Sequence, residues 1–176
     1  MDRALGKAKM SLWDERRMVR MQADIRIQVS DPHLTNESFT VQELVNLAEM
    51  KLALEDRVPN VPGDAFDVKA WYRSWKNSRG GQAESEPTHV KVEAVDEFQA
   101  LMSWSEVDSA LILYAQDGEP LKKGYPIRLY VPDGSSECLN VKSVVHIWFL
   151  HDATLGEEAT FGFKNKVTLD ELKIKK

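Results

Sequence analysis

The sequence predicts an α+β domain built around a mixed β-sheet, and three observations support this fold class. The chain has 176 residues, 43% of them hydrophobic, which is enough to bury one sizeable core. Several segments rich in Val, Ile, Leu, Tyr and Phe have the composition of strands. Two segments with helical spacing of apolar residues interrupt them in unequal blocks, which favours a mixed sheet over a repeating βαβ wind.

The first part of the chain predicts an arm followed by one strand. Residues 1–22 are rich in charge and predict either a short amphipathic helix or a poorly ordered arm. Over residues 24–29, apolar side chains alternate with polar ones as in a half-buried strand. The alternating apolar residues are Ile25, Ile27 and Val29. We therefore place the start of the domain at residue 23.

Two helices are predicted after this strand. Thr40 and Glu43 have the spacing of a capping box, and the apolar residues that follow indicate a helix over residues 41–54. A second helix is predicted over residues 64–76, where apolar residues recur at helical spacing. These residues are Phe66, Ala70, Trp71 and Trp75. An aromatic stripe of this kind is typical of a helix face that packs on a core.

The rest of the chain predicts mainly strands. Residues 88–94 alternate apolar and polar side chains, and residues 98–104 have strand composition after a turn at Asp96 and Glu97. Residues 110–149 indicate three more strands, separated by turns in which Asp-Gly and Pro recur. A sheet assembled from these segments would contain most of the second half of the chain.

We predict one domain over residues 23–152 and a C-terminal extension over residues 153–176. In this extension, Phe161–Phe163 alternate as in a strand, and Thr168 and Glu171 have the spacing of a helix cap. The extension either returns to the sheet or contacts a partner, such as a second copy of the chain.

Composition limits the classes of partner. Lys and Arg number 23 against 28 Asp and Glu, a formal net charge of -5, which argues against general binding to nucleic acid or anionic membranes. No apolar run approaches the roughly 18 residues of a membrane-spanning helix. The N-terminal charges are not followed by the apolar core of a signal peptide. We therefore expect a cytoplasmic protein that binds neither nucleic acid nor membrane.

Few residues have the pattern of metal ligands. The single cysteine, Cys138, excludes an internal disulfide and a cysteine-rich metal site. His146 and His151 lie five residues apart with no third ligand nearby in the sequence, so we interpret them as structural histidines. Motifs typical of nucleotide binding, zinc proteases and serine hydrolases are missing from the sequence. We therefore predict no metal.

Four segments of the second half carry a family resemblance. They read V-E-A-V-D-E-F-Q-A, S-A-L-I-L-Y-A-Q-D-G-E-P-L, K-G-Y-P-I-R-L-Y-V-P and N-V-K-S-V-V-H-I. In this order they resemble the second half of the molybdopterin-binding domain of sulfite-oxidase-type oxidoreductases. The resemblance covers roughly residues 90–147, about half of the chain. It implies a mixed α+β domain, which agrees with the fold class predicted above.

The resemblance also implies a ligand site. Arg128 corresponds to the family's arginine that contacts the pterin, and Asp96 to the aspartate of the turn before an aromatic residue. Lys123 stands where the family has a histidine. The remaining implied contacts come from one segment that holds the cofactor, Asn140, Val141 and Lys142. Cations and backbone N–H groups are what a phosphate group would need, and a pterin edge needs paired donors and acceptors.

The sequence departs from the family at the metal. The family binds molybdenum through a cysteine in the first half of the domain, where this chain has none; Cys138 lies in the loop that enters the last strand. We therefore expect a non-catalytic or degenerate module that binds a pterin-like or other anionic ligand. The alternatives are an active molybdenum oxidoreductase and a structural or protein-interaction module without a ligand.

Overall fold

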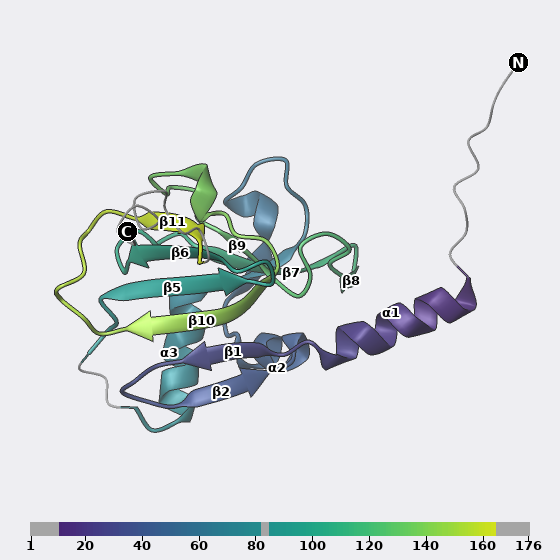
Figure 1. Ribbon diagram of the computed structural model, residues 1–176, viewed down its shortest axis with the longest axis horizontal. Helices are drawn as coiled ribbons and strands as arrows, with labels where there is room; N and C mark the ends of the chain where they lie inside the picture. Colours follow the sequence, from purple (N-terminus) through teal and green to yellow (C-terminus); the bar gives the residue numbers. More distant parts are fainter. Residues whose placement is uncertain (1–10, 82–84, 165–176) are drawn as a thin grey trace, which may run out of the picture.

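The computed structural model describes residues 11–81 and 85–164, which form a mixed α+β fold with two sheets (Figure 1). The larger sheet has the strand order β11-β6-β5-β10-β1-β2. Its strands are β1 (Ile27–Ser30), β2 (Asn36–Phe39), β5 (His89–Ala94), β6 (Phe98–Ser103), β10 (Val144–Leu150) and β11 (Thr160–Phe163). Most neighbours pair antiparallel, but β1 and β10 pair parallel, so the predicted mixed sheet is confirmed.

The smaller sheet is formed around β7, which pairs with β4, β8 and β9. Its strands are β3 (Lys51–Ala53), β4 (Asp64–Asp67), β7 (Leu111–Gln116), β8 (Glu119–Pro120) and β9 (Arg128–Tyr130). The α-helices are α1 (Leu12–Asp24), α2 (Val41–Leu47) and α3 (Val68–Ser78), and the 3₁₀ helices are η1 (Leu54–Asp56) and η2 (Glu137–Leu139). None of the helices in the described ranges is long and apolar enough to cross a membrane.

Aromatic side chains of α3 pack on the larger sheet and form the centre of the main core. Trp71, Tyr72 and Trp75 are at most 3% exposed. Each contacts the ring of Phe149 on β10, with centroids 4.4–6.5 Å apart. Aromatic pairs at these distances stabilise a core beyond the area that they bury. The prediction that the tryptophans belong to the core is therefore confirmed.

The first predicted helix is confirmed at its start and wrong at its end. Thr40 and Glu43 form the capping box in both directions, but α2 ends at Leu47. Residues 51–53 instead form β3, which pairs with β4, and Leu54 begins η1. Lys, Leu, Ala and Glu favour a helix by intrinsic propensity, and strand pairing overrides that weak preference here.

The start of the second predicted helix is also wrong. Asp64–Asp67 forms β4, and α3 begins at Val68. Asp67 caps this helix, because its Oδ1 accepts a hydrogen bond from the N–H of Ala70 at 2.8 Å. Its other oxygen accepts from Arg57 at 2.6 Å. Aspartate at this position is the local signal that marks the true helix start.

The strands predicted in the second half are confirmed, with one additional short strand, β8, between β7 and β9. Of the C-terminal extension, Thr160–Phe163 returns to the larger sheet as β11 and pairs with β6. The predicted turn at Thr168–Leu172 lies outside the described residues. Toward the N-terminus, the described part of the predicted arm is helical. It forms α1, which extends away from the larger sheet (Figure 1).

Candidate functional sites

Three segments that carry the sequence-predicted site residues meet at Ser143. The N–H of Ser143 donates to the carbonyl of Gly124 at 3.2 Å, and its carbonyl accepts from the N–H of Val95 at 3.0 Å. The turn before β6, the loop before β9 and the segment before β10 are thus joined by backbone hydrogen bonds. We call this region, residues 95–97, 122–128 and 140–143, the Arg128 site.

Arg128 is the most unusual residue of this site. Its Nε is buried and has no hydrogen-bond partner among the described residues. The guanidinium carbon lies 5.1 Å from the ring centroid of Tyr130, which shares its face of β9. A buried donor without a partner is rare in folded proteins, so this nitrogen requires an explanation, such as strain or a functional role.

Backbone geometry holds the Arg128 side chain in place. Gly124 has φ of +80°, a conformation that favours glycine. A Cβ at Gly124 would lie 2.5 Å from Cδ and 2.6 Å from Cγ of Arg128. The stem of the arginine therefore packs directly on the glycine backbone, and only glycine leaves room for it.

The other predicted residues divide into two groups. Asp96, Lys123 and Lys142 are exposed, so their charged groups are open to a ligand in solvent. Asn140 and Val141 are used within the protein. The Oδ1 of Asn140 accepts from the N–H of Val131 at 2.7 Å, and Val141 is 2% exposed. The carbonyl of Val141 also accepts from the N–H of Leu129 at 2.8 Å, so these two residues tie the segment to β9 and the residue that follows it.

Most charged side chains of the Arg128 site are exposed. Lys123, Arg128 and Lys142 line none of four hollows of about 330–440 Å³ that described residues form. Cys138 is exposed in η2, and its N–H donates to Ser136 Oγ at 3.1 Å. The site therefore presents the cations Lys123 and Lys142 and the carboxylates Asp96 and Glu97 to the surface.

A second cluster, Asp31, His33 and His151, was missed by the sequence reasoning. Asp31 follows β1 and His151 follows β10, and these strands run parallel as neighbours, so their carboxyl ends lie at the same edge of the sheet (Figure 1). Potential ligand atoms of the three side chains all lie within 4.8 Å of one another. We call these residues the Asp31 cluster.

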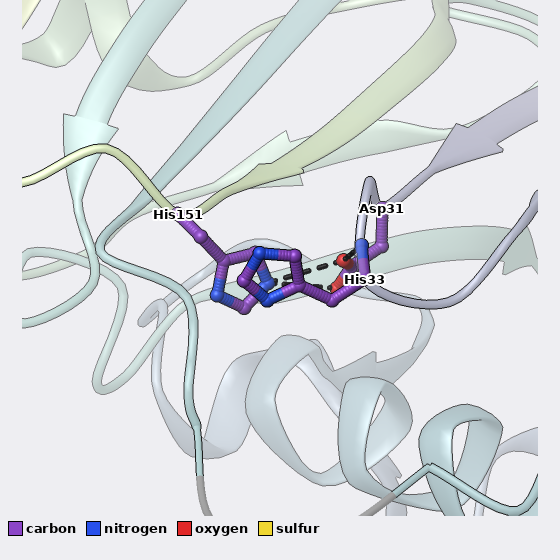
Figure 2. Close-up of side chains that lie close together, drawn as sticks. All are labelled: Asp31, His33 and His151. Carbon is purple, nitrogen blue, oxygen red and sulfur yellow. Dashed lines mark hydrogen bonds and ion pairs between the residues drawn. The ribbon is translucent and has the colours of Figure 1, made fainter.

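Figure 2 shows how the Asp31 cluster is arranged. Nε2 of His151 lies 3.1 Å from both carboxylate oxygens of Asp31. The rings of His33 and His151 stack with centroids 3.9 Å apart. Asp31 also fixes the turn that carries His33, because its Oδ1 accepts from the N–H of His33 at 2.8 Å. One carboxylate thus positions both histidines.

Asp31 is a buried carboxylate whose partners are mostly neutral donors. It is 1% exposed, and its Oδ2 accepts from the hydroxyl of Tyr72 at 2.8 Å. Burial, together with the hydrogen bond to Asp31 and its negative charge, raises the pKa of the Tyr72 hydroxyl. Tyr72 therefore stays protonated and donates to the carboxylate.

The Asp31 cluster borders a hollow of about 400 Å³. Two cationic residues line it, but both are engaged elsewhere. Nζ of Lys76 donates to the carbonyl of Ser85 at 2.7 Å, and the guanidinium of Arg79 binds the carboxylate of Glu37 at 2.6–2.7 Å. The remaining lining residues are His33, Leu34, Tyr72, Gly80, Gly81, Ser85 and His151.

His146 is separate from this cluster. Its Nε2 hydrogen-bonds with Ser30 Oγ at 2.9 Å, and its ring stacks on Trp148 with centroids 3.4 Å apart. Burial lowers the pKa of His146.

The local sequence signal that would have found the Asp31 cluster is the Asp-Pro-His turn at residues 31–33, which places a carboxylate two residues before an imidazole.

No known protein-family model matches this chain, and no curated protein matches it. A proposal for the function therefore rests on the α+β class, the Arg128 site and the Asp31 cluster. The Arg128 site offers charge at the surface, and the Asp31 cluster offers imidazole and carboxylate donors beside a hollow.

Proposed function

We propose that this chain is a sulfite-oxidase-like, molybdopterin-binding-fold protein that acts as a non-catalytic module. It binds a pterin-like or other anionic ligand at the Arg128 site. The order of four segments over residues 90–147 resembles that family, and the observed α+β class is compatible with it. The observation that carries the proposal is the buried Nε of Arg128, which has no partner among the described residues.

The chemistry of the site fits the anionic end of such a ligand. Arg128 offers a planar set of donors that suits phosphate oxygens, and Gly124 holds its stem in place. Lys123 is exposed on the same segment as Arg128, and Lys142 is exposed on the segment that Ser143 joins to it. Asp96 adds an acceptor on the neighbouring turn for the N–H groups of a pterin edge.

The non-catalytic part of the proposal rests on the donor set. Molybdenum in the family is bound by a cysteine thiolate, and the only thiol of this chain is Cys138, on η2. If a pterin binds, it supplies a phosphate and a ring edge with hydrogen-bonding groups. The residues of this chain would then bind and orient it, with Arg128 as the principal contact.

Bound pterin in the purified protein tests the proposal. The full chain is produced in a host that makes molybdopterin, and pterin released by denaturation is oxidised and measured by fluorescence. We expect pterin in the native protein, a large loss in Arg128→Ala and no loss in Arg73→Ala. Arg73 is a suitable control because it is exposed and pairs with Glu86 on the surface.

A thermal titration with pyrophosphate separates the two ligand classes. A rise in melting temperature that Arg128→Ala removes, without bound pterin, supports a different anionic ligand. Absence of both pterin and the pyrophosphate effect would refute the proposal. Stoichiometric molybdenum bound together with pterin would refute its non-catalytic part and favour an active oxidoreductase.

A further inference from the structure

We propose that Asp31, His33 and His151 form a binding site for one Zn²⁺ ion. This site is separate from the Arg128 site, because the two lie at opposite ends of β10. Residues 140–143 precede that strand, and His151 follows its last residue, Leu150. At about 3.3 Å per residue, a strand of seven residues separates them by roughly 20 Å.

The donor set is the first argument for zinc. Two imidazoles and one carboxylate are a combination that zinc binds with a fourth position open to water. Mg²⁺ and Ca²⁺ prefer sites made of oxygen ligands alone. The cluster therefore favours a divalent transition metal over the alkaline-earth ions, and zinc is the representative without redox chemistry.

The geometry needs only a small adjustment. The candidate ligand atoms lie within 4.8 Å of one another, whereas ligands on a tetrahedral zinc at about 2.1 Å are separated by about 3.4 Å. His33 is exposed, so its ring can rotate between staggered conformations without disturbing the core. Asp31 and the backbone of the turn stay in place, because Asp31 is buried and held by Tyr72.

The local charge balance is the second argument. In the described chain, the ion pair of Asp31 is with His151, and no Lys or Arg pairs with it. A buried carboxylate without a full countercharge is costly. The cations that line the hollow, Lys76 and Arg79, are bound to Ser85 and Glu37. A divalent cation would supply the missing charge.

The surroundings also suit a metal. The hydroxyl of Tyr72 donates to Oδ2 of Asp31, which is the kind of outer hydrogen bond that orients metal ligands. The side chain of His151 is 7% exposed and that of Asp31 is fully buried, whereas His33 is open to solvent. An ion can therefore enter from the side of His33 and the hollow.

Zinc titration of the full chain tests the proposal. The protein, made without a polyhistidine tag, is stripped with a chelator and titrated with Zn²⁺ by calorimetry, with Mg²⁺ in a parallel titration. We expect one Zn²⁺ per chain and no binding of Mg²⁺. Co²⁺ in place of Zn²⁺ should give the visible absorption bands of a site with four or five ligands.

Variants of single ligands locate the site. Each of His33→Ala, His151→Ala and Asp31→Asn should weaken Zn²⁺ binding by more than about tenfold, since even outer-shell partners contribute that much. His33→Ala is decisive if the other variants fold poorly, because this side chain is exposed. His146→Gln and Cys138→Ser are matched controls that should bind Zn²⁺ like the native chain.

Two results would overturn the proposal. One is a native chain that takes up no Zn²⁺, in which case the Asp31–His151 contact only ties the end of β10 to the turn after β1. The other is binding that survives in His33→Ala and His151→Ala but is lost in Cys138→Ser. That outcome would place the ion at the exposed thiol.

Discussion

Replacing Arg128 by methionine should stabilise the protein, although it removes a charged group. Methionine keeps an unbranched stem to pack on Gly124 but has no N–H group. The buried Nε of Arg128 has no partner among the described residues. An unsatisfied buried donor costs about 1–3 kcal/mol, and more when it is charged. Removing it therefore lowers the free energy of the folded state.

The substitution also removes one favourable contact. The guanidinium lies over the Tyr130 ring, with Cζ 5.1 Å from the centroid. A partly exposed contact of this kind contributes about 0.5–1 kcal/mol. The net expectation is that Arg128→Met raises the free energy of unfolding by about 1 kcal/mol. A side chain that lowers the stability of the free protein in this way is typical of a functional site.

Urea denaturation followed by fluorescence measures this difference, and Arg57→Met is the matched control. The guanidinium of Arg57 donates to Asp67 at 2.6 Å, and the two side chains are 27% and 9% exposed. Losing that partner should lower the free energy of unfolding by about 2–3 kcal/mol. If Arg128→Met were destabilising by a similar amount, its guanidinium would have a structural role and the ligand argument would fail.

Three further predictions concern the rest of the fold. Thr40→Ala removes the side-chain acceptor of the capping box and should lower the free energy of unfolding, measured in urea, by about 1 kcal/mol. An unchanged urea midpoint would mean that α2 needs no cap. Trp75→Ala should cost about 3–5 kcal/mol, because the side chain is fully buried; a loss below 1 kcal/mol would contradict the core assignment. The hydrogen bond from Arg79, helped by one from Trp75, lowers the pKa of the Glu37 carboxyl. Ionised Glu37 therefore stabilises the fold above its unfolded pKa of about 4.5, and this stabilisation is lost as the pH falls through the lower pKa of the folded state. Glu37→Gln should therefore show a smaller loss of stability than the native chain between pH 5 and pH 3, and equal losses would refute this.

Local patterns in the sequence were sufficient where neighbouring residues decide the structure. The capping box at Thr40 and the strands of the second half were predicted and are present. The first strand was predicted from residue 24, but α1 extends to Asp24 and β1 begins at Ile27, so only Ile27 and Val29 of the predicted alternation are confirmed. Local patterns failed at β3 and β4. Residues 51–53 have helical propensity, but their backbone pairs with β4, and propensity is too weak to resist such pairing.

The candidate sites show the same division. The resemblance of four segments pointed to Arg128, Lys123, Asp96 and the 140–142 segment, and the structure joins their loops at Ser143. That Arg128 Nε is buried without a partner, and that Asn140 and Val141 are used internally, depends on three-dimensional packing. No sequence pattern carries that information, because burial is a property of the assembled core.

By itself, the sequence determined the α+β class and most strands, since these follow from composition and alternation, whereas the residues of the Arg128 site were predicted only from a family resemblance. Only the tertiary structure decided that Asp31 and His151, 120 residues apart, share a hydrogen bond. Their contact follows from the parallel pairing of β1 with β10, which places the carboxyl ends of both strands at one edge of the sheet. Such long-range pairing depends on the whole core, which no local pattern describes.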